Sequence, residues 1–400
     1  MKNYLCLIAF AYASPAGADT VYSSLRDIAI PAGFNGVYLD VDAGSTFAGT
    51  SLGAPAGWDI NFFFGGAGIA NSPAFQPARS GTANLDAIVK FQAGTLISEF
   101  LNYSSGFGGS GDDHQHIGTA VTQFQPDQEG YLGFEFTRNG SASTLHGWMR
   151  VVLNYGGMAG PVIRDWAYDD SGGSINIGRI HQSAPAAGQQ QVTLSPGSGE
   201  SFSLGSAITD SDVGIGSLLK IGSGTTILST ANSYSGRTSI MGGSLALGSS
   251  AALPSAAPMT LSNAMLETRG FSASTGPFSL STGVIDFGTL ATSSLTFSDT
   301  NTWSGVLSIW NWTGTANTAG DTGTDRLVFL ANTGLGAGAR DLGEVRFFSD
   351  SGQTLLGEGR SALVGDELVP VPEPADLAVG ALLSLAVLRH GILRRRKAAV

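Results

Sequence analysis

Short runs of alternating apolar and polar residues, broken by glycine, constrain this chain more than any other feature of its sequence. They recur at residues 36–41, 58–64, 87–91, 130–136, 146–153 and 163–169. A period of two sends successive side chains to opposite faces, which is the pattern of a β-strand. Glycine supplies 57 of the 400 residues, and Lys90 and Lys220 are the only lysines between residues 19 and 370, so good helix formers are scarce. The sequence therefore predicts an all-β fold.

Residues 19–180 are predicted to form one domain of antiparallel strands. The runs follow one another at hairpin spacing, and Asn139-Gly140 is a typical two-residue turn. An antiparallel β-sandwich is the natural architecture for such strands. Residues 181–214 begin with a stretch rich in Gln and Ala that contains Pro185, and they are predicted to be a linker and connecting segment.

The region 215–370 opens with a patterned unit at residues 216–248. Within it, Gly216-Ser-Leu-Leu-Lys220-Ile-Gly-Ser-Gly-Thr-Thr-Ile-Leu228 is followed by Asn232-Ser-Tyr-Ser-Gly and a Gly-Gly-Ser-Leu-Ala-Leu-Gly run. This unit resembles the autotransporter-associated β-strand repeat, which implies a short parallel β-solenoid or a related β-rich region. Residues 257–288 look like a degraded continuation. A single repeat cannot bury its own apolar face, so neighbouring strands are expected to cap it.

The first 18 residues have the composition of a secretory signal peptide. Lys2 precedes a short apolar run, and Ala16-Gly17-Ala18 is a small-residue cleavage box, so cleavage is predicted after Ala18, with Ala13 as the second choice. A buried N-terminal strand is the alternative. The only cysteine, Cys6, lies in this run, so no disulfide can form within the chain.

Residues 371–400 combine a proline motif, an apolar stretch and a basic end. Pro372, Glu373 and Pro374 precede twelve uncharged residues at 377–388, and the cluster Arg394, Arg395, Arg396 and Lys397 follows. If Arg389 reaches toward the interface, residues 377–393 are just long enough for a single C-terminal transmembrane helix, with the cluster held in the cytoplasm.

This tail resembles the PEP-CTERM sorting domain, whose motif is matched by Pro372, Glu373 and Pro374. The resemblance implies that an exosortase processes the chain near the motif, after an inner-membrane-anchored stage, and that the mature protein reaches the cell surface or the extracellular matrix. Residues 130–178 also resemble a run found in extracellular domains of such proteins. An ordinary C-terminal anchor behind a Pro-rich stalk is the alternative.

Candidate metal ligands are few. Asp112, Asp113, His114 and His116 cluster in one Gly-rich stretch, where a solvated loop is the competing interpretation. Asp210 and Asp212 have calcium-loop spacing without the distal glutamate of a complete loop, and Asp321 and Asp325 are a weaker pair. No cofactor is predicted.

The sequence also disfavours several classes of function. A formal net charge of −11 repels phosphate backbones, so nucleic acid is not an expected partner. No serine stands in a Gly-x-Ser-x-Gly setting between a strand and a helix, and carboxylates are sparse along residues 216–288, so the protein is not expected to be an enzyme. The sequence favours a structural or adhesive surface protein associated with biofilm or extracellular polysaccharide. The alternatives are a carbohydrate-binding protein, with Trp303, Trp310 and Trp312 as possible sugar contacts, and a polysaccharide-degrading enzyme.

Overall fold

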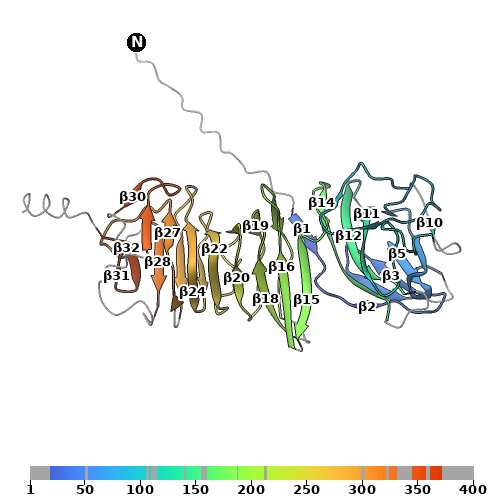
Figure 1. Cartoon of the computed structure of the whole chain (residues 1–400), viewed down its shortest axis with the longest axis horizontal. Coiled ribbons are helices and arrows are strands. Elements are labelled where there is room, and N and C mark those ends of the chain that lie inside the picture. Colours follow the sequence, from blue (N-terminus) through green and yellow to red (C-terminus); the bar gives the residue numbers. More distant parts are fainter. Residues whose placement is uncertain are drawn as a thin grey trace, which may run out of the picture.

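The computed structural model shows an elongated, all-β molecule. It describes residues 19–49, 53–104, 108–109, 115–138, 141–154, 160–186, 188–210, 214–298, 302–320, 324–330, 345–356 and 361–371. One short 3₁₀ turn, η1 (Phe64–Gly66), is the single helical element among these residues. A compact block of strands lies at one end, and a row of stacked strands extends from it (Figure 1).

Two antiparallel sheets form the block, as the sequence predicts. The smaller sheet has the order β10-β6-β5-β3-β4, with strands β3 (Val37–Asp40), β4 (Ser45–Ala48), β5 (Ile60–Phe63), β6 (Gly68–Asn71) and β10 (Gly108–Gly109). The facing strands are β1 (Asp19–Tyr22), β2 (Ile28–Ala29), β7 (Phe75–Pro77), β8 (Lys90–Phe91), β11 (Glu129–Thr137), β12 (Thr144–Val152) and β13 (Val162–Asp169). A small pair, β9 (Leu96–Ile97) and β14 (Ile175–Asn176), lies beside them.

Alternation explains the core of this sandwich. Leu39, Ile60 and Phe62 from one sheet and Leu132 and Phe134 from the other are fully buried in one apolar cluster. Their strand neighbours point the opposite way, because successive side chains of a strand alternate between faces.

Beyond the sandwich, the chain winds into a stacked series of parallel strands that form a β-solenoid. One column of hydrogen-bonded strands contains β16 (Gly188–Leu194), β18 (Gly214–Lys220), β20 (Thr238–Ile240), β22 (Met259–Glu267), β24 (Phe278–Asp286) and β26 (Thr302–Trp303). A second begins with β17 (Ser201–Leu204), β19 (Thr225–Leu228) and β21 (Ser244–Leu247), uses the later halves of β22 and β24, and ends with β27 (Leu307–Trp310) and β29 (Val345–Phe348). A third contains β23 (Ala273–Thr275), β25 (Ser294–Phe297) and β28 (Arg326–Phe329).

Equivalent residues of successive turns stack inside the solenoid. Leu204, Leu228 and Leu247 pair in register along the second column, and all three are buried. In the third column, the rings of Phe297 and Phe329 stack with centroids 5.2 Å apart. Each turn thus completes the apolar core of its neighbours, which is how a repeat buries a continuous core. The expected continuation at residues 257–288 is present as the turns that contain β22 to β24.

The segment predicted as a linker, residues 181–214, is instead part of the folded structure. It contains most of β15 (Ile180–Ala186) together with β16 and β17, and β16 pairs with β15 on one side and with β18 on the other. The prediction followed composition, but strand pairing with the following turns overrides local composition.

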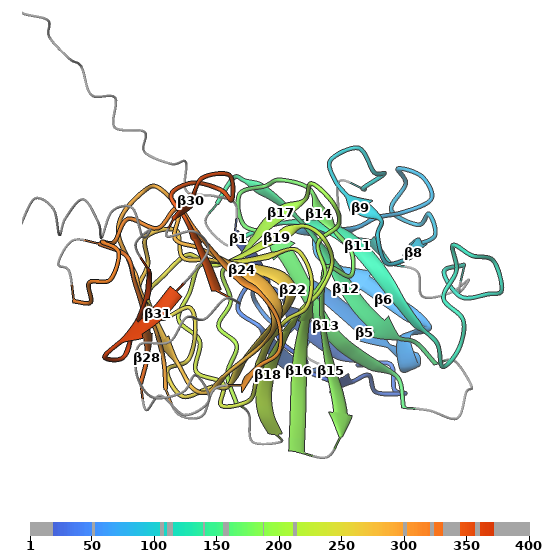
Figure 2. The ribbon, with the colours of Figure 1, turned by 60° about the vertical axis from the view of Figure 1, so that its left-hand side comes forward.

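The sandwich and the solenoid share one continuous sheet of 20 strands. Strand β1 pairs antiparallel with β13 of the sandwich and parallel with β17 of the first solenoid turn. Figure 2 shows β12 and β13 of the sandwich and β15, β16 and β18 of the solenoid in one view, and the sheet itself continues between the two parts through β1. The sandwich therefore covers one end of the solenoid core.

Antiparallel strands close the far end. Strand β29 pairs with β30 (Leu355–Leu356), and β28 pairs with β32 (Glu367–Pro370), which forms a hairpin with β31 (Ser361–Val364). Closing an exposed sheet edge in this way limits pairing with other chains. Within the described ranges, no helix is long and apolar enough to cross a membrane, and the predicted span at 377–393 lies outside those ranges.

Candidate functional site

Most residues that the sequence singles out lie outside the described part of the chain. This holds for the predicted cleavage residue Ala18, for the motif Pro372, Glu373 and Pro374, and for the basic cluster Arg394, Arg395, Arg396 and Lys397. Their predicted roles in export and sorting therefore stay predictions.

The predicted Asp-His cluster is not assembled by the described residues. Asp112, Asp113 and His114 lie outside them, whereas His116 is fully buried. The His116 Nε2 atom lies 2.9 Å from the carbonyl oxygen of Gly66, and its ring meets Phe124 edge-on. His116 thus fills space in the sandwich core.

The weaker aspartate candidates have structural partners. Asp210 accepts hydrogen bonds from the backbone N–H groups of Ser235 and Gly216, at 3.0 and 2.8 Å; the Ser235 bond, and then the Gly216 bond, lower the pKa of Asp210. Asp325 is buried and accepts bonds from Ser293 N–H and the Thr313 hydroxyl. Both carboxylates satisfy donors where the chain turns, and the paired residues Asp212 and Asp321 lie outside the described ranges.

The tryptophans proposed as sugar contacts differ in their surroundings. Trp312 is buried, and its ring packs edge-on against Phe347 with a centroid separation of 4.9 Å. Trp310 is half-buried, and the side chain of Trp303 lies outside the described part. Trp312 is therefore a core residue of the solenoid.

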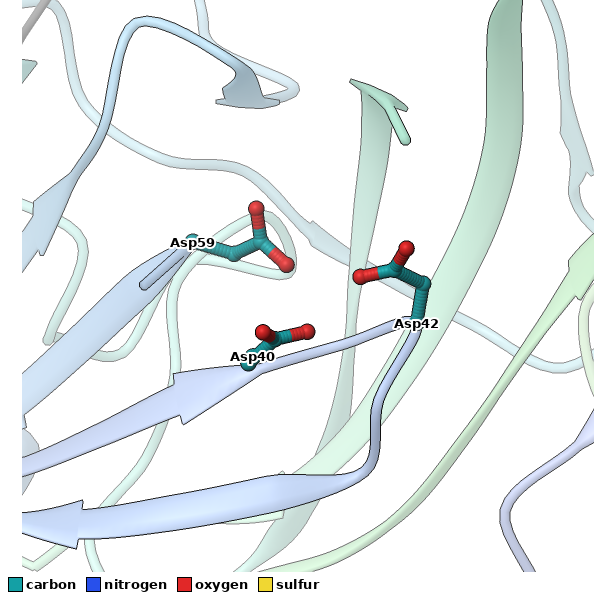
Figure 3. Close-up of side chains that lie close together, drawn as sticks. All are labelled: Asp40, Asp42 and Asp59. Atoms are coloured by element: carbon teal, nitrogen blue, oxygen red, sulfur yellow. The ribbon is translucent and has the colours of Figure 1, made fainter. Parts of the chain in front are cut away.

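A cluster of three carboxylates, which the sequence does not reveal, lies at one end of the smaller sheet. Asp40 is the last residue of β3, Asp42 lies two residues further along the chain, and Asp59 is the residue before β5. Leu39 pairs with Ile60 across these strands, which brings the three side chains together (Figure 3). One carboxylate oxygen from each residue lies within 4.8 Å of the others.

Burial raises the pKa of two of these carboxyl groups. Asp40 and Asp59 are buried, and Asp59 accepts a 2.7 Å hydrogen bond from Val41 N–H. Burial raises the pKa of Asp59 to about 7; the Val41 bond opposes this shift, and Asp40 and Asp42 add to it. Burial, and then a hydrogen bond with Asp42, raise the pKa of Asp40. Three carboxylates could supply part of the oxygen shell that Ca²⁺ or Mg²⁺ requires, but acidic clusters are common without an ion, and we assign no ligand to this one.

A buried lysine marks the repeat unit. Lys220 is inaccessible to solvent and stands in register between Leu194 and Ile240 of the adjacent turns. Its ammonium group donates to the carbonyl oxygens of Ile221, Gly222 and Gly242, at 2.8, 3.0 and 2.9 Å. Burial lowers the pKa of Lys220 to about 8. Because Gly242 belongs to the following turn, Lys220 ties two turns together.

A second buried polar group lies where the sandwich meets the solenoid. Arg150 of β12 donates from Nε to Asp165 of β13 at 2.9 Å and from Nη2 to the Gln182 carbonyl of β15 at 3.0 Å. The Tyr22 hydroxyl donates to Asp165 at 2.7 Å. Burial raises the pKa of Tyr22, and burial together with the Arg150 charge lowers that of His181, whose Nδ1 lies 2.6 Å from Arg150 Nη1. Strands from both parts of the molecule are thus joined by one network.

Comparison with known proteins identifies the repeat. The family model described as Passenger-associated-transport-repeat matches residues 218–247, which include β19, β20 and β21. This match supports the predicted likeness of residues 216–248 to autotransporter-type repeats. No curated protein and no solved structure matches the chain. The repeat and the solenoid are features of structural or repeat proteins.

Proposed function

We propose that this chain is an exported, non-catalytic structural or adhesive protein of the bacterial surface or extracellular matrix. One observation carries the proposal: the passenger-type repeat lies within a stacked solenoid whose sheet continues without a break into the sandwich. Such an arrangement makes a long, stiff body, because each turn packs against its neighbours along the whole row.

Export and sorting follow from the two ends of the sequence. In this proposal the first 18 residues are removed on secretion, and an exosortase processes the chain at Pro372-Glu373-Pro374. The precursor is held in the inner membrane by residues 377–393, and the mature protein associates with extracellular polysaccharide. The resemblance of the tail to the PEP-CTERM domain supports this route.

Cell fractionation tests the route. In cells with an exosortase, we expect a shortened protein at the surface or in the medium, and mass spectrometry should place its new C-terminus near Glu373. In cells without the exosortase, and for Glu373→Ala in cells that have it, the full-length precursor should remain in the membrane fraction. Asp376→Asn, three residues beyond Glu373, is the matched control and should be processed normally. An unchanged size and location in the absence of the exosortase would show the sorting proposal to be wrong.

A carbohydrate-binding protein is the second candidate. The observation that favours it is a pocket between the sandwich and the solenoid, lined by both charged and aromatic side chains. A glycan array probed with the full chain tests this candidate, and binding of no glycan would count against it.

A further inference from the structure

The pocket lies at the junction, between elements that belong to both parts of the molecule. It has a volume of about 210 Å³ and is lined by residues of β1, β12, β13, β14, β15 and β17 and of the turns beside them. Binding sites commonly form where two structural units meet, because neither unit alone fills the space between them.

One wall of the pocket presents fixed hydrogen-bonding groups. Arg179 Nη2 donates to Glu200 Oε1 at 2.7 Å, and Asn176 Nδ2 donates to the same oxygen at 3.2 Å. The other Glu200 oxygen is held by Gly197 N–H. These contacts hold a guanidinium, a carboxylate and an amide in defined positions, so donors and acceptors are available together.

A buried polar atom in this wall lacks a partner. Arg179 Nε is inaccessible to solvent and makes no hydrogen bond to any of the described residues. A buried donor without a partner is unfavourable, and native structures usually satisfy such groups with protein, water or ligand. Because Nε is closed to solvent, a ligand in the pocket would meet the exposed part of this side chain, which keeps 27% of its surface accessible, and not Nε itself.

Another part of the lining is apolar, beside the polar residues Thr20, Asp169, Ser174 and Ser201. Trp148 is almost completely buried, and Ile175, Ile180 and Phe202 complete this part of the pocket. Trp148 also packs edge-on against Tyr131 and is tilted against Tyr22, which fixes its ring. Trp148 therefore lies at the base of the pocket, and the half-buried Phe202 is the aromatic side chain that a ligand can reach. An aromatic side chain beside polar groups suits a ring-shaped ligand with apolar C–H faces and polar edges.

We propose that this pocket binds one neutral sugar residue of a polysaccharide. Hydroxyl groups, each both donor and acceptor, match the Arg179, Glu200 and Asn176 wall, and the C–H groups of the sugar ring match the apolar lining. Asp169 and Glu200 outnumber the single cation Arg179 in the lining, which disfavours anionic sugars. The volume lies below the roughly 300–1,000 Å³ of pockets for larger ligands, so it selects one ring.

The inference deepens the polysaccharide association in the proposed function and names its site. Export and sorting are tested in cells, whereas sugar binding is measured on the purified full chain. Failure of one experiment therefore leaves the other standing.

Binding is measured by saturation-transfer NMR and calorimetry with glucose, galactose and N-acetylglucosamine, and with galacturonate as the anionic comparison. We expect at least one neutral sugar to bind and galacturonate to bind more weakly. Arg179→Met should lower the affinity by about tenfold or more, because hydrogen bonds to charged groups are the strong ones. Arg164→Met is the matched control, because Arg164 pairs with Asp27 and does not line the pocket. This variant should change the sugar affinity less than twofold, since exposed ion pairs contribute little.

A second variant, which obstructs the pocket opening, tests the proposal if Arg179→Met does not fold. Ser201 is exposed in β17 and lines the pocket, so Ser201→Trp fills the opening without removing a core side chain. This variant should fold and lose sugar binding. The proposal is overturned if the wild-type chain binds no neutral sugar at millimolar concentration, if galacturonate binds best, or if Ser201→Trp binds as well as the wild type.

Discussion

Two buried ionisable residues, Asp59 and Lys220, show how single side chains adapt to a core that is otherwise apolar. Asp59 lies close to two other carboxylates, and its burial favours the neutral acid. Lys220 interrupts an apolar ladder, and three carbonyl oxygens surround its ammonium group. Both residues can be tested through stability.

The raised pKa of Asp59 predicts how stability depends on pH. The folded chain holds a proton on Asp59 up to about pH 7, whereas the unfolded chain releases it near its ordinary pKa of about 4. The folded state therefore binds more protons between these values, and this contribution to the unfolding free energy is lost as pH rises through about 7. Asp59→Asn should remove this part of the pH dependence, on the order of 2–4 kcal/mol.

Denaturant unfolding from pH 4 to 8, with a chelator present to exclude divalent cations, measures this effect. The sandwich should be followed by a probe of its own, such as hydrogen exchange of β3 and β5. The same slope in Asp59→Asn as in the wild type would assign the pH dependence to other groups.

Lys220→Met tests the link between turns. Met matches the length of the lysine stem but leaves the Ile221, Gly222 and Gly242 carbonyl oxygens without this donor. We expect the unfolding free energy to fall by about 1–3 kcal/mol, the cost of unsatisfied buried polar groups. Lys90→Met, which replaces a buried lysine of the sandwich, is the control variant, and hydrogen exchange of the solenoid strands is measured in both variants. Only Lys220→Met should speed exchange in β18 to β21, and a more stable Lys220→Met would show that the ammonium group is a net cost.

At the scale of the element, the corners of the solenoid turns require glycine for two separate reasons. Gly222 has a φ of +74°, a region that favours glycine, and a Cβ atom there would lie 2.3 Å from the Pro196 carbonyl oxygen of the preceding turn. Gly288 has a φ of +73°, but its nearest neighbouring atom would be 3.9 Å away. The two corners therefore share a backbone conformation, but only the corner at Gly288 has room for a Cβ atom.

Alanine substitutions separate the cost of the backbone conformation from the cost of the steric clash. Gly288→Ala should cost about 1–2 kcal/mol, the penalty for a left-handed alanine. Gly222→Ala should cost clearly more, because the clash with a backbone oxygen can be relieved only by moving one turn away from the next. Thermal and denaturant unfolding give both values, and equal losses would mean that the turns move apart easily.

At the scale of the whole molecule, the shared sheet predicts that sandwich and solenoid unfold together. The Arg150, Asp165 and Tyr22 network reinforces this connection at the junction. Arg150→Met leaves the buried Asp165 without its cation and should cost about 3–5 kcal/mol, whereas Arg164→Met, at an exposed pair, should cost at most about 1 kcal/mol.

Two probes distinguish cooperative from separate unfolding. Hydrogen exchange of β11 and β12 reports on the sandwich, and that of β24 and β27 reports on the solenoid. In the wild type both should exchange with the same unfolding free energy, and Arg150→Met should lower both. Loss of protection in the sandwich alone would show that the continuous sheet does not couple the two parts.

The sequence by itself determined the all-β class, the antiparallel character of residues 19–180 and the solenoid repeat near residues 216–248, because alternation and corner glycines are local patterns. Only the tertiary structure decided which strands pair. It made β15, β16 and β17 out of a stretch whose composition predicts a linker, since the backbone hydrogen bonds there come from distant strands. It also brought Asp59 to Asp40 and Arg179 to Glu200, and no spacing in the sequence encodes the register that does so.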